Sequence, residues 1–100
     1  MQELKAYPTE FPDSWARQYI GTIDGTLYYI GPADNTAIYD HLSLWKAEIS
    51  MLKDGELHAK MIARYKTKYA EGLGNFFFTD DDTICGSDYD KGILLEIKLK

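Results

Sequence analysis

The sequence has a single cysteine, Cys85, among its 100 residues. One thiol cannot close a disulfide within the chain, so the disulfide-stapled scaffolds of small secreted proteins are excluded. The first residues lack the basic segment and apolar run of a secretory signal. No stretch approaches the roughly 18 consecutive apolar residues of a membrane helix. We therefore expect a cytoplasmic protein that does not interact with a membrane.

The sequence also lacks the motifs of common catalytic and cofactor sites. It has no P-loop, no Cys-x-x-Cys pair and no nucleophile elbow. Its only Cys and His residues are His41, His58 and Cys85, and a structural zinc site normally draws on four such ligands. An EF-hand alignment on Gly92 fails because lysines stand at two of its ligand positions. The sequence predicts no metal, no cofactor and no enzymatic activity.

Positive charge is scarce, with 11 Lys and Arg against 16 Asp and Glu and a net charge of −5. Such a chain is repelled by phosphate backbones, so we expect no direct contact with nucleic acid. Lys60, Arg64 and Lys68 recur at helical spacing, but exposed aromatics do not alternate with them. We interpret these three residues as a solvated helical face.

Prolines are few, three in all, and two of them lie near the start of the chain. Pro8 and Pro12 bias their neighbours toward extended backbone. Residues 1–16 are therefore predicted to form an extended arm packed on a single domain that spans residues 1–100. The expected apolar anchors of this arm are Tyr7, Phe11 and Trp15.

Two segments have the pattern of β-structure. Residues 18–31 carry β-forming side chains on both sides of Asp24-Gly25, a dipeptide that favours two-residue hairpin turns. The segment 92–100 alternates apolar and polar residues, which predicts a strand. The residues of its apolar face are Ile93, Leu95, Ile97 and Leu99. Leu94 falls on the polar face, where we expect another element to lie near it.

The middle of the chain has helical periodicity. Its apolar residues recur at intervals of 4, 3, 4 and 3, which predicts a helix over 35–53 with Trp45 buried against a sheet. These residues are Ile38, Leu42, Trp45, Ile49 and Leu52. Gly55 can adopt the left-handed conformation that ends a helix, so a second helix is predicted over 55–71. The order ββ-αα-ββ predicts an α+β fold, a small antiparallel sheet with an antiparallel helical pair packed on one face.

Acidic residues are concentrated in the stretch FFFTDDDTICGSDYDKG, which spans residues 76–92. Strand alternation predicts that Phe76 and Phe78 point into the core and that Phe77 faces the opposite side. The aspartates have two interpretations: they form solvated turns, since Asp bonds its own nearby backbone, or they form a recognition surface for an Arg- or Lys-rich cleft. The residues of that surface would be Asp80, Asp81, Asp82, Asp88, Tyr89 and Asp90.

Small size, acidity and eight tyrosines favour a non-enzymatic protein-binding module whose partner has a basic surface. Such features suit a phage or mobile-element inhibitor that blocks a nucleic-acid-handling host protein. One alternative is a structural or assembly protein that forms homo-oligomers, such as a homodimer, through strand edges or tyrosines. A second alternative is a small-molecule-binding domain that uses His41 and nearby acids.

Overall fold

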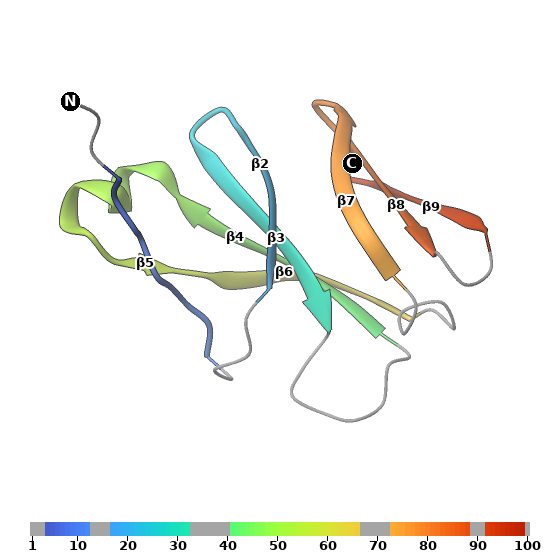
Figure 1. Cartoon of the computed structure of the whole chain (residues 1–100), viewed down its shortest axis with the longest axis horizontal. Coiled ribbons are helices and arrows are strands. Elements are labelled where there is room, and N and C mark those ends of the chain that lie inside the picture. The colour runs from blue at the N-terminus through green and yellow to red at the C-terminus, as the bar shows by residue number, and fades with distance from the viewer. Residues whose placement is uncertain (1–3, 13–16, 33–40, 67–72, 89–91, 100) are drawn as a thin grey trace.

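The computed structural model describes residues 4–12, 17–32, 41–66, 73–88 and 92–99, and it is built almost entirely of β-strands (Figure 1). Four strands form an antiparallel sheet in the order β2–β3–β4–β6, and three form a second antiparallel sheet in the order β7–β8–β9. The bounds of the first sheet are β2 Gln18–Ile23, β3 Thr26–Pro32, β4 His41–Glu48 and β6 Lys60–Lys66. The bounds of the second are β7 Leu73–Asp80, β8 Thr83–Asp88 and β9 Ile93–Lys98. Two short strands, β1 (Thr9–Glu10) and β5 (Leu57–His58), pair in parallel, and a 3-10 helix, η1, spans Ile49–Asp54.

The hairpin predicted over residues 18–31 is confirmed. Asp24 and Gly25 join β2 to β3 and both have positive φ, 50° and 79°. Two positive φ angles define the turn whose twist matches that of the flanking strands. The local sequence therefore predicts both the turn and the two strands that flank it.

The predicted α+β fold with a helical pair is wrong. Residues 41–48 form β4 and residues 60–66 form β6, and these strands pair with each other. In β4, Leu42 and Leu44 enter one core while Trp45 enters another on the opposite side of the sheet. A strand buried on both faces does not alternate between apolar and polar residues. The helical spacing arose because Leu42 and Trp45, which lie on opposite faces of β4, were counted as one stripe together with Ile49 and Leu52 of η1.

The second predicted helix is replaced by β5 and β6. Gly55 does adopt the left-handed conformation, with φ 73°, but it caps the 3-10 helix rather than an α-helix. Lys60 and Arg64 therefore belong to a strand, not to a helical face. Ile38 and Lys68 of the predicted helices lie outside the described residues.

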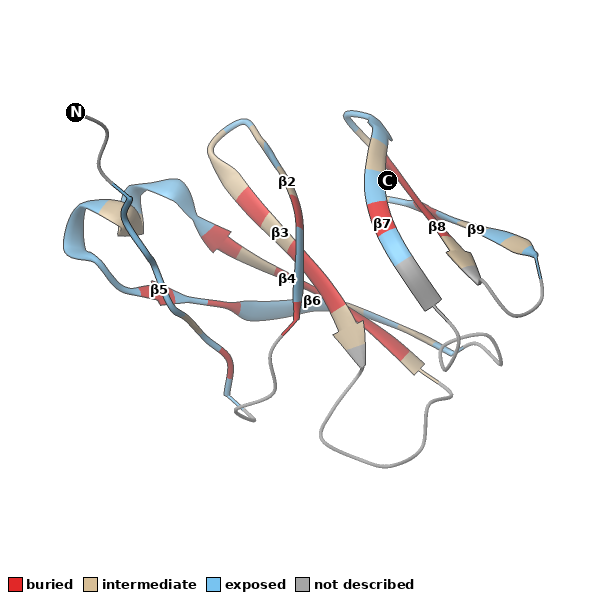
Figure 2. Cartoon of the chain, in the orientation of Figure 1, coloured by how far each residue is buried: buried red, intermediate tan, exposed pale blue. Residues whose placement is uncertain are grey.

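The four-stranded sheet has a core on each face. On one face lie Phe11, Leu27, Tyr29, Trp45, Ala47, Leu57 and Ala59. On the other, between the two sheets, lie Ile20, Ile30, Leu42, Leu44, Phe76, Ile84 and Ile97. Figure 2 shows the buried residues along β3, β4 and β8. Trp45 is buried as predicted, but against aromatic residues and an arginine rather than beneath a helix.

The N-terminal arm closes the first of these cores. Phe11 packs edge-on against Tyr29 and Trp45, with ring centroids 5.4 Å apart in both pairs. The guanidinium carbon of Arg17 lies 4.6 Å from the Trp45 ring centroid, within the range of a cation–π interaction. Of the three expected anchors, Phe11 is buried, Tyr7 is partly exposed and Trp15 lies outside the described residues.

One face of the three-stranded sheet packs on the four-stranded sheet. Phe76, Ile84 and Ile97 point toward the four-stranded sheet, while Phe77 and Leu94 are 48% and 65% exposed. The inner face is tightly packed at Gly86, where an added Cβ would lie 2.3 Å from Cε1 of Phe76. Within the described part of the chain, no helix is both long and apolar enough to cross a membrane.

Candidate interaction surface

The strand β8 divides the acidic stretch into two parts. Asp80 ends β7, the turn follows at Asp81 and Asp82, and Asp88 is the last residue of β8. Six residues of strand span roughly 20 Å, so the two acidic parts lie at opposite ends of the sheet. Tyr89 and Asp90 lie outside the described residues. Of the predicted recognition residues, the structure brings together Asp80, Asp81 and Asp82, which we term the acidic turn.

Hydrogen bonds hold the acidic turn in place. The backbone N–H of Asp82 donates to Oδ1 of Asp80 at 3.0 Å, the local bond expected of an aspartate that stabilises a turn. The hydroxyl of Thr83 donates to Oδ1 of Asp82 at 2.9 Å. The backbone N–H of Leu99 donates to the carbonyl oxygen of Asp82 at 2.8 Å, which ties the turn to the end of β9. These hydrogen bonds thus hold the backbone that carries the three carboxylates in one conformation.

The electrostatics of the turn favour the ionised form of the Asp80 carboxyl. Hydrogen bonding with Asp82, through its side chain and its backbone, lowers the pKa of the Asp80 carboxyl below its ordinary value. The Thr83 hydroxyl and the positive charge of Lys98 act in the same direction. The Nζ of Lys98 donates to the Thr83 hydroxyl at 2.9 Å, so this cation lies beside the turn. Asp80 itself is fully exposed, so its charge faces solvent.

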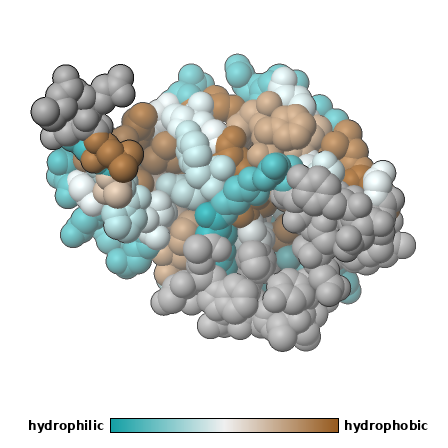
Figure 3. All heavy atoms as spheres, in the orientation of Figure 1, coloured by the Kyte–Doolittle hydropathy of each residue, from teal (hydrophilic) through white to brown (hydrophobic). Residues whose placement is uncertain are grey.

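The sheet beside the turn presents an outer face, which we define by Phe77, Cys85, Leu94 and Glu96. Phe77 pairs across the strands with Cys85, which pairs in turn with Glu96. The alternation predicted for Phe76, Phe77 and Phe78 is confirmed. The expectation that another element lies near Leu94 is wrong, because Leu94 is one of the most exposed apolar residues described. In Figure 3, apolar residues are visible on the side of the molecule that holds β7–β9 and also elsewhere on the same face.

Cys85 lies at the middle of this face but is buried, as expected of a structural cysteine. Its neighbours across the strands are the larger side chains of Phe77 and Glu96. The nearby Thr83 is also buried, and the Nζ of Lys98 donates a hydrogen bond to its hydroxyl. No local sequence pattern indicates this contact, since Thr83 and Lys98 meet through the pairing of β8 with β9.

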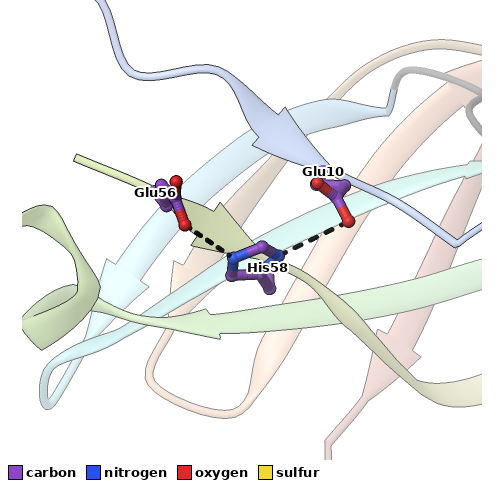
Figure 4. A network of polar contacts seen from close by, with 3 residues as sticks. All are labelled: Glu10, Glu56 and His58. Carbon is purple, nitrogen blue, oxygen red and sulfur yellow. Dashed lines mark hydrogen bonds and ion pairs between the residues drawn. The ribbon is translucent and has the colours of Figure 1, made fainter. Parts of the chain in front are cut away.

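A second polar cluster lies at the opposite end of the molecule, where the N-terminal arm meets β5 (Figure 4). The imidazole of His58 lies between two carboxylates, with Nδ1 3.6 Å from Glu10 and Nε2 3.4 Å from Glu56. His58 lines a hollow of about 240 Å³ together with Pro8, Thr9, Glu10, Gly55, Glu56 and Leu57. The side chains of His58, Glu10 and Glu56 are largely exposed. Among the described residues, no group of three or more His, Cys, Asp or Glu is arranged to hold a metal ion.

No family model, no curated protein and no solved structure matches this chain.

Proposed function

We propose that this chain is a non-enzymatic protein-binding module that uses the outer face of β7–β8–β9 and the adjoining acidic turn. The partner is a protein with an Arg- or Lys-rich surface. In this arrangement Phe77 is the apolar anchor, and Asp80 and Asp81 form the acidic rim. Interfaces commonly combine an apolar centre with a polar rim, and aromatic residues often contribute most of the binding energy.

The observation that carries the proposal is the exposure of Phe77 beside an ordered acidic turn. Phe77 is 48% exposed although both neighbours in the chain, Phe76 and Phe78, pack into the core. It precedes Asp80 by three residues on β7, or roughly 10 Å along the strand. Because the turn is held by hydrogen bonds, little conformational freedom is lost when a partner docks against it.

Charge supports the choice of partner. The chain carries a net charge of −5, and the side chains of Asp80 and Asp81 are exposed. The electrostatic field of such negative charges accelerates association with a cationic surface, and this acceleration is lost as salt is added. Proteins that handle nucleic acid have such surfaces, so an inhibitor that occupies a nucleic-acid cleft fits this proposal. A free thiol at Cys85 suits the reducing cytoplasm as the compartment.

Quantitative affinity capture tests the proposal. The tagged chain is compared with Asp80→Lys/Asp81→Lys and with Phe77→Ser, using extract of the source cells as prey. Glu56→Lys/Asp54→Lys and Ile62→Ser are the matched controls, because these exposed residues lie away from β7–β9. A partner that both surface variants lose, that both controls retain and that dissociates in high salt supports the proposal.

The two acidic parts are then separated by a further variant, Asp88→Lys/Asp90→Lys. Because β8 places Asp88 far from the acidic turn, we expect this variant to weaken capture less than Asp80→Lys/Asp81→Lys. If all folded variants capture the same proteins in the same amounts as the parent, the outer face and the acidic turn are not the binding surface.

A further inference from the structure

Among the described residues, the two antiparallel sheets have four outer strands, and three of these are irregular. The pairing of β2 shifts between Tyr19 and Gly21, and that of β6 shifts opposite Leu44 and Trp45. The pairing of β7 shifts twice, between Leu73 and Phe76 and between Phe78 and Asp80. Bulges of this kind are a common protection against unwanted strand pairing.

The fourth outer strand, β9, has no such protection. Its six residues pair with β8 in unbroken register, from Ile93 opposite Asp88 to Lys98 opposite Thr83. Its exposed charges, Glu96 and Lys98, have opposite sign. Within the described residues, β9 pairs with β8 alone. It is therefore the outer strand best suited to accept another strand.

The direction of the backbone groups shows which residues would pair. The N–H of Leu99 donates to the carbonyl oxygen of Asp82, across the β9–β8 side. Hydrogen-bonded and non-hydrogen-bonded positions alternate along an antiparallel pair. The backbone groups of Ile97 and Leu95 therefore also face β8, and those of Leu94, Glu96 and Lys98 face away from it.

We propose that two copies of this chain associate through β9, which pairs antiparallel with its counterpart about a two-fold axis at Ile97. The inference does not depend on the binding function proposed above. In this register Glu96 of each copy lies opposite Lys98 of the other. The backbone groups of both residues face away from β8, so they are available for hydrogen bonds to the second copy. Opposite charges at directly facing positions stabilise a strand pair. The three-stranded sheets of the two copies then form one continuous sheet of six strands.

Charge selects this register over its neighbours. A two-fold axis at Glu96 would place two glutamates face to face, and an axis at Lys98 would place two lysines face to face, both unfavourable. The outer strand β6 offers no comparable solution. Antiparallel pairing of two β6 strands about Ala63 would place Lys60 opposite Lys66 of the other copy, a like-charge pair.

Apolar residues support the same pairing from the inner side. A hollow of about 250 Å³ lies beside β9 and is lined by Leu42, Tyr65, Lys66 and the β9 residues 95–98. Leu95 and Ile97 point to this side, since both pack with the core between the sheets. The second copy would bring its own Ile97 against Ile97 at the axis, which extends the apolar layer next to the hollow.

Sedimentation velocity over a concentration series tests the dimer. We expect a reversible monomer–dimer equilibrium in the parent chain. Glu96→Lys and Lys98→Glu should each raise the dimer dissociation constant about tenfold, because two attractive cross-strand pairs become repulsive. The double variant Glu96→Lys/Lys98→Glu restores both pairs and should return the constant toward that of the parent. Lys60→Glu on β6 is the matched control and should leave the equilibrium unchanged.

A proline variant tests the backbone part of the proposal. Glu96→Pro removes an N–H that faces away from β8, so the β8–β9 ladder keeps its hydrogen bonds. It should abolish the dimer while the thermal midpoint measured on dilute monomer stays close to that of the parent. A chain that stays monomeric up to about 1 mM, a weak affinity by any standard, overturns the proposal. A dimer that the single charge reversals leave unchanged, or that the double reversal does not restore, overturns it as well.

Discussion

The two sheets of this protein differ in how many of their faces are covered. The four-stranded sheet has a core on each side, one closed by the N-terminal arm and one shared with the second sheet. The described residues of the three-stranded sheet join one core only, and its outer face exposes Phe77 and Leu94. Among the described residues, the first sheet therefore contributes to both cores and the second sheet to one of them.

The difference also explains why β9 could be predicted from the sequence and β4 could not. β9 has one buried face, so its apolar residues keep the period of two that identifies a strand. β4 has two buried faces, and its buried residues include Ser43, a polar side chain inside the core. Because packing on both sides buries most residues of β4, the strand lacks the alternation of apolar and polar residues by which a strand is recognised.

The largest loss in the free energy of unfolding is expected when a buried side chain on either face of β4 is truncated. Trp45→Ala should lower the free energy of unfolding by about 3–5 kcal/mol, and Leu44→Ala by about 2–5 kcal/mol, because each leaves a cavity in a different core. Leu94→Ala on the outer face of the second sheet should change it by less than about 0.5 kcal/mol. Urea unfolding followed by circular dichroism measures all three. Similar losses at Leu94 and at Leu44 would mean that both sheets are covered on both faces.

A smaller effect is expected where the second sheet touches the first. Gly86→Ala would place a Cβ 2.3 Å from the Phe76 ring, so the inner face has to repack. Overpacking of this kind costs about 1–3 kcal/mol. Ser87→Ala, at the next position along β8, is the control. Adding Phe76→Leu to Gly86→Ala should recover part of the loss, and a double variant with strictly additive losses would argue against this contact.

The smallest expected effect on stability is that of the Asp80 carboxylate in the acidic turn, and it depends on pH. The pKa of Asp80 is lower in the folded chain than its ordinary value, so the ionised carboxylate stabilises the fold. That contribution is present above the pKa of the unfolded chain and is lost as the pH falls through the folded pKa. The difference in thermal midpoint between the parent and Asp80→Ala should therefore shrink as the pH is lowered from 6 toward 2, while Asp81→Ala serves as the control. A difference that stays constant over this range would contradict the role assigned to the Asp80 carboxylate.

Part of the candidate surface was predictable from the sequence. The orientation of Phe77 followed from strand alternation, and the turn at Asp80–Asp82 followed from the local hydrogen bonding that aspartate favours. The separation of this turn from Asp88 depends on the full extent of β8. The exposure of Leu94 depends on what packs beside β9. No local sequence pattern encodes the separation of the turn from Asp88 or the exposure of Leu94. The helical pair failed for the same reason, because the two cores that bury β4 are assembled from distant segments.

The most direct test of the uncovered outer face is the rate at which its cysteine reacts with a thiol reagent. Cys85 is the only thiol, and on the outer face its cross-strand neighbours are Phe77 and Glu96. Phe77→Ala should speed the labelling of native protein several-fold while the free energy of unfolding changes by less than about 1 kcal/mol. Labelling that occurs only through global unfolding, with a rate that follows overall stability and is unaffected by Phe77→Ala, would contradict an uncovered outer face.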